Sequence, residues 1–339
     1  MDQRFIRCLL TVLVSLVTFV SILGWGLTPA QGAQLERAKP EINKLSVGMS
    51  VASISFLPLW AADERGFYKE EGITDVKVLP FKGDADTLQA LASGVINMNV
   101  ASLTSLVVGI ESGQKFRAVW SGFNMPQFDW YAQPRFKSIA ETKGGRYAVS
   151  KYGAFTDFIT RYALRNAGLD PEKDVKILQL GGSVNSLAAL EAGQLEATIL
   201  VHPYTYMAAE KGFVKLMSMK DLAPDWPNHV VYTKEEFIAK NPNFIKAFLR
   251  ANGKAIEWIK ANREEAANLA SKVLKLKVEY SRRAIDDIAD QWHSDGRLPG
   301  KGLKIHWEIA VQAGDVKEPW PDSKWLDDSF LKTQSQWRQ

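Results

Sequence analysis

Residues 82–100 read KGDADTLQALASGVINMNV, and residues 181–199 read GGSVNSLAALEAGQLEATI. Both stretches have the order of a glycine loop, a short helix, a terminating glycine and a strand, and Asp86 and Asn185 fall at the same helix-cap position. At an offset of 99 residues the shared positions are Gly83 with Gly182, Leu88 with Leu187, Ala90 with Ala189, Leu91 with Leu190, and Gly94 with Gly193. This repeat predicts two similar α/β lobes, one in each half. The alternative is that any helix–glycine–strand unit looks alike, because these residue types are common.

Strand and helix patterns alternate around both copies. The expected strands are 45–49, 76–79, 95–100, 147–149, 175–180 and 197–201, with helices beginning at Pro58, near Asp84 or Asp86, at Phe155 and at Tyr204. Pro58 suits a first helical turn, where its missing N–H costs nothing. The chain after residue 233 is mainly helical, and Pro242 begins one of its helices. Alternation of this kind predicts parallel sheets covered by helices on both faces.

Composition excludes several classes of protein. The chain has 339 residues, of which 46% are hydrophobic and 24% charged, as in an ordinary folded protein of about two domains. Its 42 basic and 38 acidic residues form no long run of one sign, so no nucleic-acid partner is expected. Cys8 is the one cysteine and lies in a segment expected to be removed, which excludes disulfides, thiol catalysis and cysteine-ligated metals.

The N-terminus has the pattern of a secretory signal peptide. Arg4 and Arg7 precede an uncharged apolar run over residues 8–23, and small residues follow it. Cleavage after Gly32 places Ala30 and Gly32 at the −3 and −1 positions. Residues 1–32 are therefore expected to be removed on export to the periplasm. The alternative is an uncleaved signal anchor, because the apolar run approaches the length that spans a membrane.

Catalytic and metal-binding patterns are missing from the sequence. The four histidines, at positions 202, 229, 293 and 306, are widely spaced, and each is expected in a loop or at the surface rather than as a ligand. The sequence contains no nucleophile elbow and no phosphate-binding P-loop. We therefore predict no catalytic residue, no metal site and no cofactor, and expect a protein that is not an enzyme.

The loops that follow the predicted strands carry the candidate binding residues. In a parallel sheet, ligands bind beyond the carboxyl ends of the strands, where helix N-termini present free N–H groups. The alternative is that these residues are ordinary helix caps and core aromatics. Tyr152 is the exception, because it lies between a lysine and a glycine and is poorly placed for a core. Lys82 and Lys151 are cations that suit an anionic ligand. The candidate ligand-binding residues are Ser53, Phe56, Trp60, Gly83, Asp84, Ser102, Phe123, Lys151, Tyr152, Gly153, Asn185, His202 and Tyr204.

Three segments resemble a known family. They are PLWAADERGFYKEEG (58–72), LQALASG (88–94) and AALEAG (188–193), and they are followed by the pair His202–Pro203. Together they are similar to the periplasmic substrate-binding proteins of ABC importers, in the nitrate, sulfonate and taurine group that also includes thiamine-precursor binders. The likeness covers about residues 45–260. One departure is that Asn97 stands where the family has an acidic residue after the first ALASG, whereas the second copy keeps Glu196.

The resemblance implies a two-lobed periplasmic-binding-protein type II fold, with a ligand cleft between lobes that close by a hinge. The first lobe is expected at 44–128 plus 232–339 and the second at 129–231. The protein is then a monomeric receptor that captures a small molecule and delivers it to an ABC permease in the inner membrane.

Three alternatives concern the ligand and the partner. The aromatic residues of the loops favour a small organic anion, such as a sulfonate or an aromatic carboxylate. A thiamine-pyrimidine precursor binder is one alternative. An enzyme of the same fold is another, but such enzymes depend on a cysteine-rich iron motif that this chain lacks. A periplasmic sensor input, which hands its liganded form to a receptor, is the third.

Overall fold

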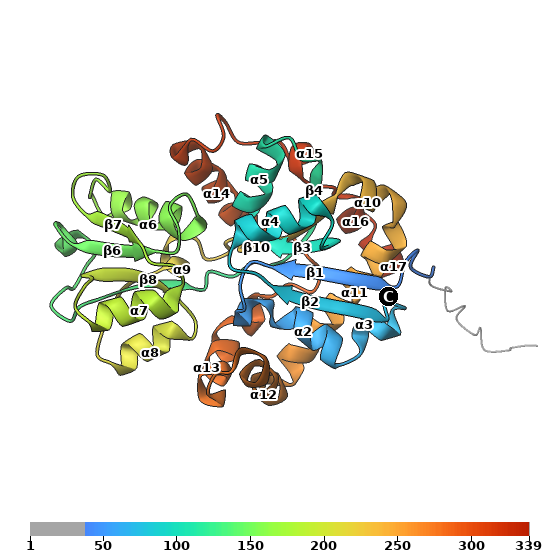
Figure 1. The fold of residues 1–339 in the computed structure, drawn as a ribbon, viewed down its shortest axis with the longest axis horizontal. Coiled ribbons are helices and arrows are strands. Elements are labelled where there is room, and N and C mark those ends of the chain that lie inside the picture. The colour runs from blue at the N-terminus through green and yellow to red at the C-terminus, as the bar shows by residue number, and fades with distance from the viewer. Residues whose placement is uncertain (1–37, 339) are drawn as a thin grey trace, which may run out of the picture. The chain divides into compact units, whose positions relative to one another are not determined.

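A computed structural model describes residues 38–338; the predicted signal peptide lies outside these residues. From Lys39 onward the chain forms one compact unit that contains two five-stranded sheets (Figure 1). We call each sheet, with the helices packed on it, a lobe. The chain passes between the two sheets over residues 124–127 and 223–228.

The two sheets have the same strand arrangement. The first has the order β2-β1-β3-β10-β4 and the second the order β7-β6-β8-β5-β9. In each, three parallel strands are followed by an antiparallel strand, so the sheets are mixed rather than wholly parallel as predicted. The first-sheet strands are β1 (Lys44–Met49), β2 (Asp75–Pro80), β3 (Met98–Ala101), β4 (Phe116–Phe123) and β10 (His229–Lys234). The second-sheet strands are β5 (Phe128–Ala132), β6 (Arg146–Val149), β7 (Lys176–Gln179), β8 (Ala197–Val201) and β9 (Val214–Ser218).

Helices connect these strands in both lobes. Those between the strands of the first sheet are η1 (Ile54–Phe56), α2 (Leu57–Glu64), α3 (Phe67–Glu70), α4 (Asp84–Ser93) and α5 (Leu103–Glu111). Those of the second are η2 (Ala140–Thr142), α6 (Phe155–Asn166), α7 (Ser183–Glu191), α8 (Tyr204–Glu210) and α9 (Met219–Leu222). The helical C-terminal region holds α10 (Glu235–Lys240), α11 (Pro242–Ala261), α12 (Arg263–Leu274), α13 (Val278–Ile288), η3 (Ala289–Gln291), α14 (Gly300–Ala313), α15 (Asp322–Trp325), α16 (Ser329–Lys332) and α17 (Gln334–Trp337).

The repeated segments form equivalent parts of the two lobes. The first contributes α4 and β3, and the second contributes α7 and β8. Their helix caps differ from the prediction: the N-cap residues are Gly83 and Gly182, while Asp86 and Asn185 lie in the first turn. Gly94 ends α4 in the left-handed conformation, with φ of 81°, which a glycine adopts without strain.

The difference between Asn97 and Glu196 has a structural explanation. Asn97 Oδ1 accepts the backbone N–H of Ser46 at 2.9 Å, at the start of β1. Glu196 Oε2 accepts the backbone N–H of Arg146 at 2.8 Å, at the start of β6, and also pairs with the Arg146 guanidinium. Both side chains therefore tie the strand that follows them to the neighbouring parallel strand. Asn97 performs with an amide the role that Glu196 performs with a carboxylate.

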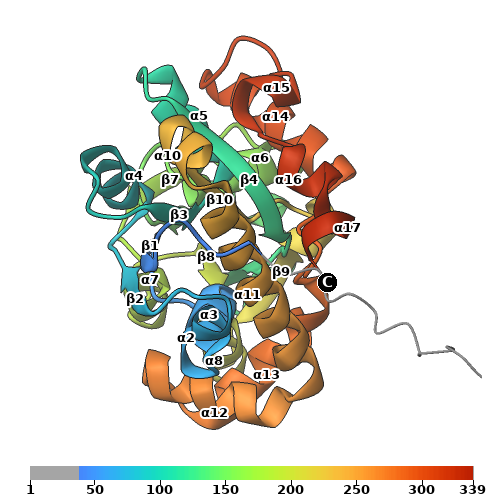
Figure 2. The ribbon, with the colours of Figure 1, turned by 90° about the vertical axis from the view of Figure 1, so that its right-hand side faces the viewer.

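Apolar cores lie on both faces of each sheet. In the first lobe, α2, α11, α12 and α13 cover one face (Figure 2), and α4, α5 and α14 cover the other. In the second lobe, α6 packs on one face, and α7 and α8 pack on the opposite face. With helices on both faces, polar groups for a ligand can be presented only at the ends of the parallel strands.

Candidate ligand-binding site

The carboxyl ends of the parallel strands bring the predicted loops together within each lobe. In the first lobe β1, β2 and β3 run in one direction, so the loops beginning at Ser50, Phe81 and Ser102 leave the same edge of the sheet. In the second lobe β6, β7 and β8 do the same, and their loops begin at Ser150 and Leu180 and at His202. This is the edge of an α/β sheet at which ligands bind.

A carboxylate occupies the loop edge of the first lobe. Ser102, the N-cap residue of α5, donates its hydroxyl to Asp84 Oδ2 at 2.5 Å and accepts the Ser105 N–H at 3.0 Å. Burial raises the pKa of Asp84 above its ordinary value, and hydrogen bonds from Ser102 and Ser50 act in the opposite direction. Because Asp84 lies in the first turn of α4, its oxygens take the place that an anion would occupy at these helix N-termini.

At the corresponding edge of the second lobe, no N-cap side chain covers the helix N-termini. The N-cap residues of α6 and α7 are Ala154 and Gly182, and neither provides a side-chain cap. Asp157 reaches back to the Gly153 N–H at 3.0 Å, so the start of α6 is partly satisfied. Lys151 is exposed in the same loop region. An anionic group is therefore better accommodated beside α7 than beside α4.

His202 lies at the end of β8, in a cis peptide bond with Pro203, and is buried. Its Nδ1 is 2.6 Å from Thr205 Oγ1, and its ring stacks on Tyr206 with a centroid separation of 5.0 Å and an angle of 6°. Burial lowers the pKa of His202, while the nearby carboxylates of Asp129 and Asp287 act to raise it. A neutral imidazole at this position can exchange hydrogen bonds with a ligand but brings no charge.

Polar residues that the sequence did not single out line the connections between the lobes. Gln127, in the first connection, is buried, and its Oε1 has no hydrogen-bond partner within residues 38–338. His229 follows the second connection. Its Nδ1 is 3.0 Å from Asn228 Nδ2, and its ring centroid is 4.3 Å from that of Phe56. Burial lowers the pKa of His229 to about 3. From the sequence, Gln127 had no expected role, and His229 was expected only as a loop or surface histidine.

Exposed apolar side chains lie in these loops or in the helical turn that follows them. Val51 is 50% exposed, Tyr152 53% and Val184 59%, and each follows a parallel strand of one lobe or the other. Tyr152 therefore lies outside the core, as predicted. Its hydroxyl donates to the Ile177 carbonyl at 3.1 Å, which places it along the edge strand β7. Apolar surface exposed at loops of both lobes fits a ligand with an apolar part.

The other predicted site residues fall into two groups. Phe56 and Phe123 have no exposed surface and belong to the core between the first sheet and helices α2 and α11. The half-buried Trp60 also packs on this core, in accordance with the core alternative. The remaining residues lie in the loops or in the first turns of the helices that follow them. These are Ser53 (N-cap of η1), Gly83 (N-cap of α4), Gly153 (φ 71°), Asn185 (bonded to the Leu180 carbonyl) and the half-buried Tyr204.

The histidines agree with the prediction only in part. His202 lies in the turn between β8 and α8, as expected, although it is buried, whereas His229 begins β10 and His306 lies within α14, both buried. His306 lies between Trp226 and Trp307, with ring centroids 5.6 and 5.2 Å away. Aromatic packing, rather than metal binding, explains these positions. Within residues 38–338, no three histidine, cysteine or acidic side chains are grouped so as to hold a metal ion.

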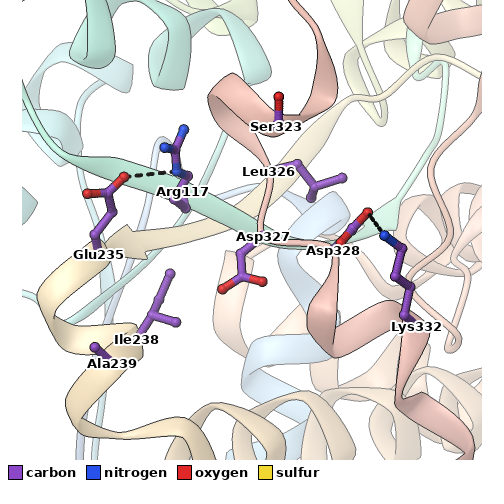
Figure 3. A pocket seen from close by; sticks show the side chains of 9 residues that line it. All are labelled: Arg117, Glu235, Ile238, Ala239, Ser323, Leu326, Asp327, Asp328 and Lys332. Carbon is purple, nitrogen blue, oxygen red and sulfur yellow. Dashed lines mark ion pairs between the residues drawn. The ribbon is translucent and has the colours of Figure 1, made fainter.

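A cavity of about 600 Å³ lies elsewhere, between the first residues of β4, α10 and the C-terminal helices (Figure 3). Four of its five charged side chains form two ion pairs, Arg117 with Glu235 at 2.9 Å and Lys332 with Asp328 at 2.7 Å. The fifth, Asp327, accepts the backbone N–H of Ser329 at 3.1 Å. Arg117 lies near the start of β4 and Glu235 follows the end of β10, at the edge opposite the candidate loops. Because both of its cations are already paired, this cavity is a weaker site for an anion than the loops.

Among residues 38–338, no helix is long and apolar enough to cross a membrane.

Comparisons with known proteins agree with this architecture. The relative named "Putative binding protein YtlA", from Bacillus subtilis (strain 168), is 25% identical over 232 residues, covering 64% of this chain and 66% of its own length. The "Putative aliphatic sulfonates-binding protein" of the same organism is 24% identical over 330 residues, covering 94% and 95%. The chain thus spans about 66% of the first of these relatives and nearly all of the second.

The fold is shared with a solved periplasmic protein. The nitrate-binding protein NrtA from Synechocystis PCC 6803 superimposes with a TM-score of 0.66 at 20% identity, covering 87% of this chain and 86% of that one. These matches confirm the predicted two-lobed fold and the predicted resemblance to sulfonate- and nitrate-binding proteins. A family model described as NMT1/THI5 like matches residues 53–266, which is more than half of the chain. The chain therefore belongs to the NMT1/THI5-like family.

Proposed function

We propose that the protein is an extracytoplasmic solute-binding receptor that captures a small organic anion and delivers it to an ABC permease. The observation that carries the proposal is the pair of sheets with one strand order, each presenting loops with exposed apolar side chains at its carboxyl edge. The relatives named for binding sulfonates or nitrate support this function. In this proposal the chain is cleaved near Gly32, acts in the periplasm as a monomer and performs no catalysis.

The ligand in this proposal has three parts. Its anionic group lies near Lys151 and the N-terminus of α7, because Asp84 already occupies the helix N-termini of the first lobe. A group that donates hydrogen bonds lies beside Asp84. Its apolar body contacts Val51, Tyr152 and Val184, whose exposed surface it removes from water.

The lobes of the proposed receptor follow the predicted bounds, residues 44–128 plus 232–339 and residues 129–231, with two shifts at the boundaries. Phe128 begins β5 of the second sheet, and residues 229–231 belong to β10 of the first sheet. The hinge then lies in the connections 124–127 and 223–228, and closure brings the loops of the two lobes onto the ligand.

A thermal-shift screen tests the proposal. The panel contains taurine, alkyl and aryl sulfonates, nitrate, bicarbonate, aromatic carboxylates and thiamine pyrimidines. A ligand at a hundredfold excess over its Kd stabilises the folded state by about 2.7 kcal/mol, so one chemical class should raise the Tm clearly. A response to organic anions supports the proposal. A response confined to thiamine pyrimidines favours that alternative, and no response to any compound contradicts the ligand class proposed.

A further inference from the structure

Helices α8 and α13 form a contact between the two lobes. Helix α8 packs on the second sheet through Ala208, which is buried among core residues of that lobe. Helix α13 belongs to the first lobe, where Ile285 and Ile288 lie in the same core as α2 and α11. The two helices are neighbours in Figure 1, although 67 residues of chain separate their facing ends.

Five side chains make this contact, which we call the α8–α13 clasp: Tyr206 and Glu210 on α8, and Tyr280, Arg283 and Asp287 on α13. The Tyr206 hydroxyl donates to Asp287 Oδ2. Glu210 accepts hydrogen bonds from the Tyr280 hydroxyl at 2.6 Å and from Arg283 Nη1 at 2.7 Å. The Arg283 guanidinium also lies 4.4 Å from the centre of the Tyr206 ring, within the range of a cation–π interaction.

The clasp joins the candidate loops of the two lobes. Helix α8 begins directly after His202 and Pro203, and the His202 ring stacks on Tyr206. On the other side, the chain that follows α13 is attached to the loop after β1, because Trp292 Nε1 donates to the Ser55 carbonyl at 3.2 Å. A movement of either loop therefore moves one side of the clasp.

The clasp faces a different side of the molecule from the second interlobe contact. Helix α14 packs against α6, with Ile309 in the core of the second lobe. At Gly302 it approaches the connection 223–228 so closely that an added Cβ would lie 2.4 Å from the Asp225 carbonyl oxygen. The α14 contact thus lies beside a connection between the lobes, where little movement is needed on opening. The clasp, on the α7–α8 face, has polar partners that can separate and be solvated.

We propose that the α8–α13 clasp holds the lobes together over the candidate loops and sets the ratio of closed to open molecules. Tyr206 and Glu210 are positioning residues in this scheme, since both lie on the second lobe and bind side chains of the first lobe, not the ligand. The effect on ligand affinity rests on the proposed function, because an easily opened receptor binds more weakly in proportion to its closed fraction. The effect on the lobes themselves does not depend on any ligand.

The test measures the distance between the lobes in the absence of ligand. Cys8 is the chain's one cysteine, so the full chain with Cys8→Ser accepts spin labels at Lys69→Cys and Gln194→Cys, which are exposed positions in the first and second lobes. Pulsed electron paramagnetic resonance then gives the distribution of distances. The clasp variants are Tyr206→Phe, which removes only the hydroxyl, and Glu210→Arg, which repels Arg283.

The control variant is Glu264→Arg. Glu264, on α12, pairs with Arg282 at 2.7 Å, and Arg282 lies on α13 next to Arg283 of the clasp. The Glu264–Arg282 pair is about as exposed as the Glu210–Arg283 pair, but both of its partners lie in the first lobe. We expect Tyr206→Phe to raise the ratio of long to short distances about ten-fold, as loss of a hydrogen bond to a carboxylate implies. Glu210→Arg should raise it further, and adding Arg283→Glu should restore part of the short population. Glu264→Arg should leave the distribution unchanged.

The proposal is overturned if both clasp variants keep the parental distance distribution, or if the control lengthens it as much as they do. A circular-dichroism melt of each variant shows whether it is folded. Because no ligand is added, a negative result here contradicts the clasp proposal alone and leaves the proposed ligand class to its own test.

Discussion

Tyr152→Ala separates a ligand contact from a structural role. Tyr152 is 53% exposed, and its hydroxyl makes one hydrogen bond, to the Ile177 carbonyl. Loss of that exposed bond and of the half-buried ring costs about 1 kcal/mol of folding free energy. For a chain of this size, 1 kcal/mol lowers the Tm by about 2 °C. The ligand-free variant should therefore melt close to the parent.

The expected effect on binding is larger. A tyrosine buries about 200 Å² when fully enclosed, so a ligand that covers the exposed half removes about 100 Å² from water. At about 25 cal/mol per Å² this contributes up to about 2.5 kcal/mol, or nearly 70-fold in Kd. Isothermal titration with the ligand found by thermal shift measures this loss, and Tyr152→Phe should keep most of the affinity. An unchanged Kd, or a fall of more than about 5 °C in the Tm of the ligand-free variant, would refute the reasoning.

Three further predictions concern single sites. Val184→Glu should weaken binding of an anion at least ten-fold by repulsion, whereas Val95→Glu, at a position of similar exposure (59% against 61%), should not; equal titration curves would count against the site. Burial raises the pKa of Asp84 in the folded state, so the folded protein holds this proton to higher pH than the unfolded chain does, and the contribution of Asp84 to stability falls as pH rises above about 3.8. Asp84→Asn should reduce this decline, measured by urea unfolding over a series of pH values. Burial lowers the pKa of His306 to about 3, so the unfolded chain binds the extra proton and stability is lost as pH falls from about 6.5 to 3; His306→Phe should remove about 1.4 kcal/mol per pH unit from that acid-side slope, and an identical slope would contradict the assignment.

The parallel strands and their helices were predictable from local patterns. The strands at 45–49, 76–79 and 197–201 have short apolar sequences that end in loops, and each lies where expected within about a residue. The repeat also predicted two similar α/β lobes, and the two sheets share one strand order. Local patterns were sufficient because each strand–helix unit is contiguous in sequence.

Four strands were not predicted: β4, β5, β9 and β10. β4 (FRAVWSGF) and β10 (HVVYTK) are buried almost throughout, so they lack the alternation of polar and apolar residues that marks a strand. β10 pairs with β3 and β4, which are distant in sequence, and this long-range pairing decides its conformation. The expected helix from Pro58 is also divided, because Gly66 adopts the left-handed conformation between α2 and α3.

The candidate site was predictable at the level of loops. The sequence identified Asp84, Ser102 and His202, which the structure places at the carboxyl ends of the parallel strands. It did not identify Gln127 or His229, because their place at the lobe connections follows from the tertiary fold. It also could not show that Phe56 packs in the core, since an aromatic residue in a loop can either join the core or face a ligand, and the sequence is the same in both cases.

Hydrogen–deuterium exchange with and without the ligand found by thermal shift tests most directly whether the two sets of loops bind it together. The account predicts slower exchange at residues 50–57 and 82–86 of the first lobe and at 150–154 and 181–185 of the second. Protection of one lobe alone, or of the residues around Arg117 and Asp328 in the separate cavity, would contradict it.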